Sequence, residues 1–234
     1  MENLLICNNC NEKNPLYALN CSKCNAYLRP KISNIDLWQT TWKIFESPVQ
    51  AAQNIIQADH KNFIVFIIIL ICLKYSFLKA MIFNATKGEE IFGNLFTSIL
   101  NGGIPIVIGL IIFSFGMTLV NRMQGIKNRM FDNLAIYFYA FIPQLLGMLF
   151  LIPIHFALFG GYWFTFNPSP FLIKPGAATL LLIIDALLFI WSIFNVAAAT
   201  YAQTKNKFFS AASGVVVLVI IGWILLFLPI IINS

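Results

Sequence analysis

Charged residues are scarce in this chain: Asp, Glu, Lys and Arg together make up 10% of its 234 residues. A soluble domain of this length covers its surface with charged groups, so the scarcity excludes that class. Histidine is scarcer still, with only His60 and His155. Two isolated histidines form no catalytic cluster, and no carboxylate pair or cysteine–histidine arrangement replaces them. We therefore expect that the protein is not an enzyme.

Apolar residues dominate instead, with 59% hydrophobic residues, 23 phenylalanines and a mean hydropathy of +0.79. About 20 helical residues cross a hydrocarbon core roughly 30 Å thick. The composition predicts an all-α integral membrane protein with five transmembrane helices, near residues 62–83, 104–120, 134–158, 177–201 and 211–232. Pro143 and Pro153 should kink the third helix. The first apolar run begins too late to be the core of a cleaved signal peptide.

Four of the five cysteines stand in two Cys-x-x-Cys pairs before the first apolar run. Two thiolates separated by two residues can turn inward from one tight turn, so two pairs supply the corners of a tetrahedral zinc site. The spacing predicts a small zinc ribbon whose Zn²⁺ ion is structural, held by Cys7, Cys10, Cys21 and Cys24. Two disulfides are the alternative, and they would need an oxidising compartment. Cys72 lies inside an apolar run, where we expect a packing thiol.

The basic residues predict the orientation of the chain, because Lys and Arg accumulate in short cytoplasmic connections. Eleven of them lie before the first span or in the second and fourth connections, whereas the first and third connections hold only Lys87 and Lys174. We expect a cytoplasmic N-terminus and an external C-terminus, in a bacterial inner membrane because the composition is rich in Lys, Asn and Ile. The net charge of +6 thus reflects orientation, and no nucleic-acid partner is expected.

Residues 29–61 should join the zinc ribbon, residues 1–28, to the transmembrane domain, residues 62–232. Trp38, Trp42 and Phe45 recur at helical spacing, with Leu37 and Ile44 beside them. This pattern predicts an amphipathic helix that either lies among the lipid headgroups or packs on the ends of the spans.

A second short helix is expected near residues 48–59. Serine at position 47 followed by Pro48 is typical of a helix start. This helix should lead the chain toward the membrane and place Lys61 at its surface.

Three segments together carry a recognisable pattern. Residues 42–48 place a phenylalanine before Ser-Pro and a helix, residues 134–143 form an aromatic-rich run ending in proline, and residues 187–194 form a leucine run that reaches a tryptophan. They resemble the YIP family, the Ypt-interacting membrane proteins. The resemblance implies five helices and a cytoplasmic N-terminus. Eukaryotic members are associated with Rab-type GTPases, but this chain has a cysteine module in place of their Pro/Gly-rich arm, so that role is not carried over.

Lys74 and Asp185 are charged residues inside predicted spans, where a lone charge costs about 2.5 to 3.5 kcal/mol. Lys74 lies roughly 18 Å from the cytoplasmic end of the first span and Asp185 roughly 12 Å from the outer end of the fourth, at about 1.5 Å per residue. These depths coincide in a core about 30 Å thick. We expect an intramembrane ion pair, which either fixes helix register or belongs to an ion or proton pathway. His155 is expected to be an interfacial, hydrogen-bonding residue.

These features favour a multispan membrane scaffold or adaptor, embedded in the lipid bilayer, whose cytoplasmic zinc ribbon recruits a protein partner in membrane organisation or trafficking. The alternative is a small-solute or ion transporter or channel, although no internal repeat or pair of broken helices accompanies the ion pair. Small residues such as Ala198 and Ala202 allow close helix packing, either within one bundle or between copies of the chain. The sequence is therefore compatible with both a monomer and a homo-oligomer.

Overall fold

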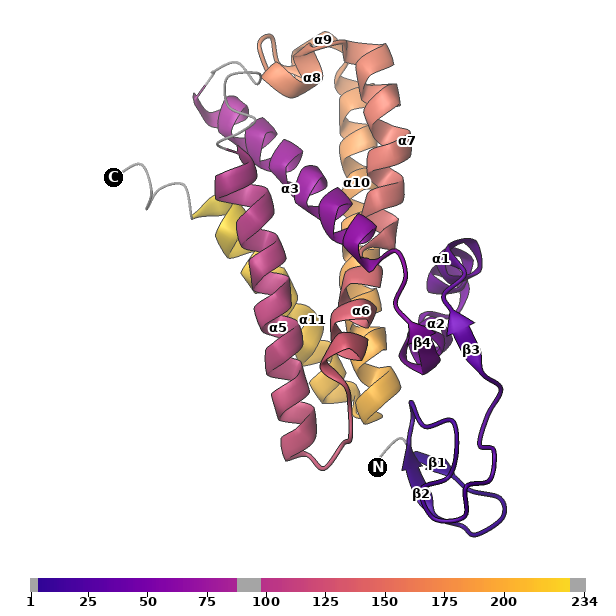
Figure 1. Ribbon diagram of the computed structural model, residues 1–234. Helices are drawn as coiled ribbons and strands as arrows, with labels where there is room; N and C mark the ends of the chain where they lie inside the picture. The colour runs from indigo at the N-terminus through magenta and orange to yellow at the C-terminus, as the bar shows by residue number, and fades with distance from the viewer. Residues whose placement is uncertain (1–3, 88–97, 228–234) are drawn as a thin grey trace. The chain divides into compact units, whose positions relative to one another are not determined.

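The computed structural model describes residues 4–87 and 98–227, most of which are helical (Figure 1). Five helical spans are long and apolar enough to cross a membrane: Ile64–Thr86, Ile99–Met123, Met130–Phe159, Pro175–Thr204 and Lys207–Leu226. The prediction of a five-helix integral membrane protein is therefore confirmed. The end of the fifth predicted span, residues 228–232, lies outside the described residues.

Three spans are single helices: α3 (Ile64–Lys87), α10 (Pro175–Thr204) and α11 (Lys207–Leu226). The second span begins with a π-helical turn, η1 (Ile99–Gly103), and continues as α5 (Ile104–Met123).

The third span is broken rather than kinked at its first proline. Helix α6 (Met130–Tyr139) ends before α7 (Ile142–Phe159) begins, and Pro143 lies in the first turn of α7. Proline lacks an N–H donor, and its ring clashes with the carbonyl four residues earlier, which belongs to Tyr139. Pro153, in contrast, stays inside α7.

The region before the first span contains two helices and two small strand pairs. Strands β1 (Leu4–Ile6) and β2 (Lys13–Pro15) pair antiparallel, and β3 (Ile32–Asn34) pairs parallel with β4 (Ala58–His60). Between β3 and β4 lie α1 (Leu37–Glu46) and α2 (Pro48–Gln57). The prediction of two helices here is correct, but the expected end of the second at residue 59 falls in β4.

Asn62 joins the segment after the second helix to the segment before the first. Its side chain accepts a hydrogen bond from Ile35 N at 2.8 Å and donates to Ile35 O at 2.9 Å. This clamp holds the chain on both sides of the α1–α2 pair in an extended conformation, which no local sequence pattern predicts.

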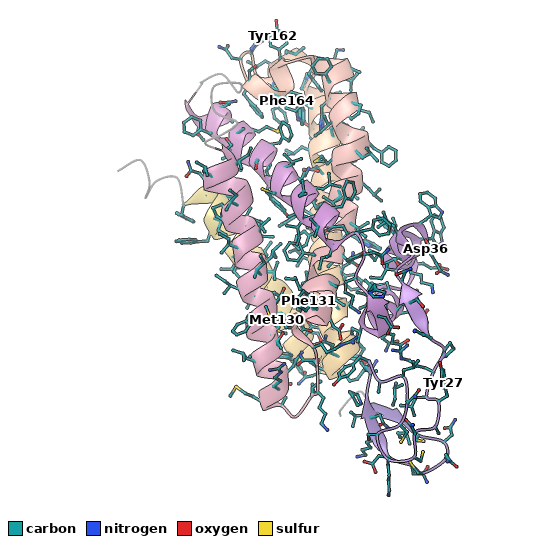
Figure 2. All side chains as sticks on the ribbon, in the orientation of Figure 1. Tyr27, Asp36, Met130, Phe131, Tyr162 and Phe164 are labelled. Atoms are coloured by element: carbon teal, nitrogen blue, oxygen red, sulfur yellow. The ribbon has the colours of Figure 1, made fainter. Side chains whose placement is uncertain are left out.

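Helix α1 has two different faces. Asp36 caps its start by accepting a hydrogen bond from Gln39 N (Figure 2). Ile44 is buried, whereas Trp38 and Trp42 are 80% and 66% exposed. Ile44, expected beside the tryptophans, therefore lies away from them, and the tryptophan face is left open.

The chain divides into two compact units. Unit 1 comprises Met1–Val65, Leu110–Ala140 and Ile193–Val217, and unit 2 comprises Phe66–Gly109, Phe141–Ser192 and Leu218–Ser234. Each unit therefore combines segments that are distant in the sequence, and several helices contribute to both.

A chain of buried polar side chains joins three helices of unit 1. Asn121 of α5 donates to Gln203 of α10, Gln203 donates to Asn133 of α6, and Asn133 donates to Thr118 of α5 at 2.7 Å. Hydrogen bonds between transmembrane helices typically contribute about 0.6 kcal/mol each. The network fixes which faces of these helices meet.

Unit 2 has an apolar core, with two short helices, α8 (Tyr162–Thr165) and α9 (Pro170–Ile173), between α7 and α10. Its buried core residues are Leu151, Phe159, Trp163, Ala178 and Leu181. The start of the second span approaches α3 closely at Gly103, where an added Cβ would clash with Ser76 Oγ and the carbonyl oxygen of Cys72.

We predict that Gly103→Ala lowers the free energy of unfolding by about 1 to 3 kcal/mol, because the new methyl group overpacks a contact that includes backbone. Gly116→Ala is the matched control, since nothing lies within 4 Å of the Cβ position there. The control should be neutral or slightly stabilising, because alanine favours a helix over glycine. Thermal unfolding of both variants in detergent checks this, and equal losses would contradict the close approach.

Candidate functional site

The thiols of four cysteines meet in the N-terminal module, residues 4–28. All four Sγ atoms lie within 4.8 Å of one another. The Sγ atoms of Cys7 and Cys24 are 3.5 Å apart, as are those of Cys10 and Cys21. A disulfide requires about 2.05 Å, so these are free thiols. The fold therefore brings together the four residues that the spacing predicts.

Two similar turns aim the thiols at one another. In the first, Asn11 N donates to Cys7 O at 2.9 Å; in the second, Asn25 N donates to Cys21 O at 3.1 Å. Asn11 and Asn25 have φ angles of 56° and 59°. Asparagine is one of the few residues besides glycine that adopt this left-handed conformation readily. An asparagine after the second cysteine of each pair thus closes each turn.

The thiol cluster has the dimensions of a tetrahedral metal site. With Zn–S bonds of about 2.3 Å, the sulfurs of a zinc tetrahedron lie roughly 3.8 Å apart. The observed separations, from 3.5 Å to within 4.8 Å, bracket that value. A backbone hydrogen bond from Cys24 lowers the pKa of Cys21 to about 6, whereas burial and the neighbouring thiols raise the pKa of Cys10 to about 12. The cluster therefore supplies one thiolate readily, and a metal ion that binds all four sulfurs must displace the remaining protons.

Asn14 supports the cluster from the neighbouring strand. It is fully buried, and its Nδ2 atom donates to Glu12 O at 2.9 Å and faces Cys21 Sγ at 3.6 Å. Its Oδ1 atom accepts from Ser22 N at 2.9 Å. Sequence reasoning missed this role, because nothing distinguishes Asn14 from the other asparagines of the module.

Three cations converge on the C-terminal carbonyl oxygens of α2, residues 55–58. Arg29 and Arg129 each donate to one of these oxygens, at 2.8 and 3.1 Å, and Lys61 donates to three. The last carbonyls of a helix have no partner inside the helix and carry the negative end of its dipole. We call this cluster the α2 cap.

Asp132 of α6 balances part of this charge. Its carboxylate lies 3.0 Å from Lys61 Nζ and 2.8 Å from Arg129 Nε, and its side chain is only 2% exposed. Burial lowers the pKa of Lys61, and the nearby Asp132 carboxylate opposes that shift. Lys61 stands just before the first span, and its side chain is only 8% exposed, because the α2 carbonyls and Asp132 give it buried partners.

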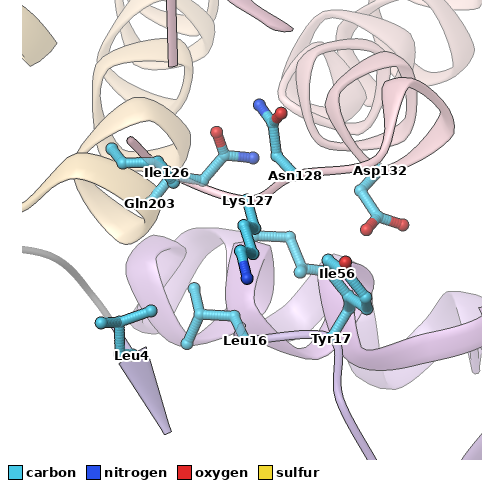
Figure 3. Close-up of a pocket in the computed structure, with 9 residues that line it drawn as sticks. All are labelled: Leu4, Leu16, Tyr17, Ile56, Ile126, Lys127, Asn128, Asp132 and Gln203. Carbon is cyan, nitrogen blue, oxygen red and sulfur yellow. The ribbon is translucent and has the colours of Figure 1, made fainter. Parts of the chain in front are cut away.

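Tyr17 connects the α2 cap to the cysteine module. The Arg129 guanidinium lies 4.6 Å from the Tyr17 ring centroid, and Arg29 donates to Tyr17 O at 2.9 Å. Beside them is a cavity of about 10 Å³, which is roughly the space of one water molecule (Figure 3). It is lined by Leu4, Leu16, Tyr17, Ile56, Ile126, Lys127, Asn128, Asp132 and Gln203. The two arginines therefore hold the module against membrane-associated helices of the same unit.

In unit 2, Lys74 Nζ of α3 lies 2.7 Å from Asp185 Oδ1 of α10. Both side chains are mostly buried, at 11% and 23% exposed. Gln144 of α7 donates to the Asp185 carbonyl at 3.2 Å and ties a third helix to the pair. The contact that the matching depths predicted is thus present in the structure.

His155, which the sequence predicts to be an interfacial, hydrogen-bonding residue, lies in the second half of α7, and an aromatic ring covers it. It is 6% exposed, and its ring stacks on Trp163 of α8 with centroids 4.0 Å apart. Its buried Nε2 atom has no hydrogen-bond partner among the described residues. The helical pattern could not reveal this, because Trp163 covers the ring from beyond the turn at Gly160 and Gly161.

Comparison with known proteins gives one result. A family model described as the Yip1 domain matches residues 42–230. The match covers all five spans as far as the structure describes them and begins after the cysteine module. No curated protein and no solved structure matches the chain.

We predict that Asp185→Asn lowers the free energy of unfolding by about 3 kcal/mol, because Lys74 is left unpaired. This value is the lower end of the range that is typical when one partner of a buried ion pair is removed. Adding Lys74→Met should restore part of the loss, since no lone charge then remains in the apolar interior. Folded yield and thermal unfolding in detergent measure both effects. Additive losses in the double variant would show that the two residues are not energetically coupled.

Proposed function

The chain belongs to the Yip1 domain family of multispan membrane proteins, and from that premise we propose that it is a scaffold or adaptor whose metal-bound module recruits a protein partner at the membrane. The observation that carries the proposal is the four-thiol cluster on a module that Arg29 and Arg129 fix to membrane-associated helices. Such an arrangement presents one folded surface at a constant position, as recruitment requires.

The metal is a structural Zn²⁺ ion held by Cys7, Cys10, Cys21 and Cys24. Four thiolates complete a tetrahedral coordination sphere and leave no position for a substrate. A module this small buries too little apolar surface to fold alone, so metal binding would supply most of its folding free energy. Zinc content thus controls whether the recruiting surface exists.

The recruiting surface includes exposed apolar residues of the module. Ile6 is 62% exposed and Tyr27 is 67% exposed. Figure 2 labels Tyr27 in the cysteine module. Tyrosine is enriched at protein interfaces because it offers a large apolar area with a polar end. A cytoplasmic protein is the partner, because the Lys and Arg distribution favours a cytoplasmic N-terminus in a bacterial inner membrane.

The exposed tryptophans of α1 contact the bilayer. Trp38 and Trp42 lie on its open face, and tryptophan rings favour the headgroup region. Helix α1 would then anchor the module close to the membrane surface. Ion transport has less support, because Lys74 and Asp185 neutralise each other at 2.7 Å.

We predict that the purified full-length protein contains one zinc ion per chain. Cys21→Ser should weaken zinc binding by at least 10- to 100-fold, and Asn14→Ala by about 10-fold, since supporting residues typically contribute that much. Cys72→Ser is the matched control and should leave the zinc content unchanged, because Cys72 lies in α3. Elemental analysis after dialysis against a chelator measures this. Zinc content that is insensitive to Cys21→Ser would refute the site.

A cross-linking experiment in intact cells tests recruitment and orientation together. A photoreactive residue at position 27 should form an adduct with a cytoplasmic protein, and Cys10→Ser should remove that adduct. Phe208, which is 90% exposed at the start of α11, is the control position on the same predicted side of the membrane. Adducts that persist in Cys10→Ser, that also form from position 208, or that contain only external proteins would contradict the proposal.

A further inference from the structure

Unit 2 contains a cavity of about 60 Å³ beside the Lys74–Asp185 pair. Helices α3, α7, α8 and α10 line it, and its polar residues are Lys74, His155 and Asp185. Its other walls are aromatic and aliphatic. Since one water molecule needs about 10 to 15 Å³ of such space, the cavity has room for several.

His155 lines this cavity, and its ring carries a polar atom that has no protein partner among the described residues. The residue is only 6% exposed, and this atom, Nε2, is itself buried. Stacking on Trp163 at 4.0 Å, with the ring planes 8° apart, fixes the ring orientation. A buried polar nitrogen without a partner is costly, so the geometry points to a ligand that hydrogen-bonds there.

The other two polar groups offer complementary bonding capacity. Lys74 Nζ has three N–H donors, and one faces Asp185 Oδ1 at 2.7 Å. A carboxylate has two oxygens and accepts up to four hydrogen bonds. The cavity therefore presents donors and acceptors side by side.

The charges select the class of ligand. Lys74 and Asp185 carry opposite charges and are in direct contact, so the site attracts neither cations nor anions. A small uncharged molecule that both donates and accepts hydrogen bonds satisfies all three residues, and water is the smallest such molecule. Buried waters typically make about three hydrogen bonds to polar groups that otherwise lack partners.

We propose that this cavity is an internal hydration site, in which water bonded to His155 Nε2 also solvates the Lys74–Asp185 pair. His155 is then a positioning residue: it holds water against the pair without forming part of it. The site makes an ion pair compatible with the apolar interior, and it gives small polar molecules a binding place within the membrane domain.

The test uses the full-length chain in lipid nanodiscs with ¹⁵N-labelled histidine. His60→Gln leaves His155 as the only histidine, so every ring signal belongs to it. NMR magnetisation transfer from water to the His155 ring should be detected. Leu78→Phe, which adds bulk to the cavity wall, should reduce that transfer several-fold.

Leu180→Phe is the matched control, because Leu180 is 59% exposed on α10 and does not line the cavity. It should leave the transfer unchanged. If Leu78→Phe does not fold, Ile152→Phe fills the same cavity from α7. Absence of transfer in the parent protein, or transfer that is unaffected by a folded cavity-filling variant, overturns the proposal.

Discussion

The interaction on which the N-terminal half depends is the binding of three cations to the end of one short helix. Arg29 directly follows the cysteine module, Lys61 comes from the entry to the first span, and Arg129 comes from the connection before α6. All three reach carbonyl oxygens of residues 55–58, and Asp132 supplies the balancing charge. Helix α2 is thereby the common partner of the module and the membrane-associated helices, and two of the three cations that bind its carbonyls, Arg29 and Lys61, are largely withdrawn from solvent.

Buried polar groups are used in a similar way along the spans. Lys79 donates to the carbonyl oxygens of Ile224 and Leu225 near the end of α11, as Lys61 does at the end of α2. The Asn121–Gln203–Asn133 network occupies unit 1, and the Lys74–Asp185 pair occupies unit 2. Apolar side chains gain little by leaving lipid for another apolar surface, so polar contacts of this kind specify which helices are neighbours.

What could be predicted from the sequence depended on whether a local rule connects residues to geometry. Cysteine spacing sets where the thiols point, and the constant rise of a helix sets the depth of a charged residue in the membrane. The thiol cluster and the Lys74–Asp185 contact could therefore both be predicted from the sequence. The α2 cap could not, because its acceptors are backbone carbonyls that every residue possesses. The environment of His155 was also hidden, since the stacking partner Trp163 follows a chain reversal whose direction no helical pattern encodes.

The parallel pairing of β3 with β4 has a mechanical consequence. The α1–α2 pair forms a loop whose two ends are joined by this pairing and by the Asn62 clamp on Ile35. A pull on the cysteine module acts on the start of β3, and resistance from α3 acts on the end of β4. Parallel strands loaded at opposite ends are sheared, so their hydrogen bonds bear the force together rather than opening one by one. Tension from a tethered partner would thus pass to the first transmembrane helix while α1 and α2 stay folded.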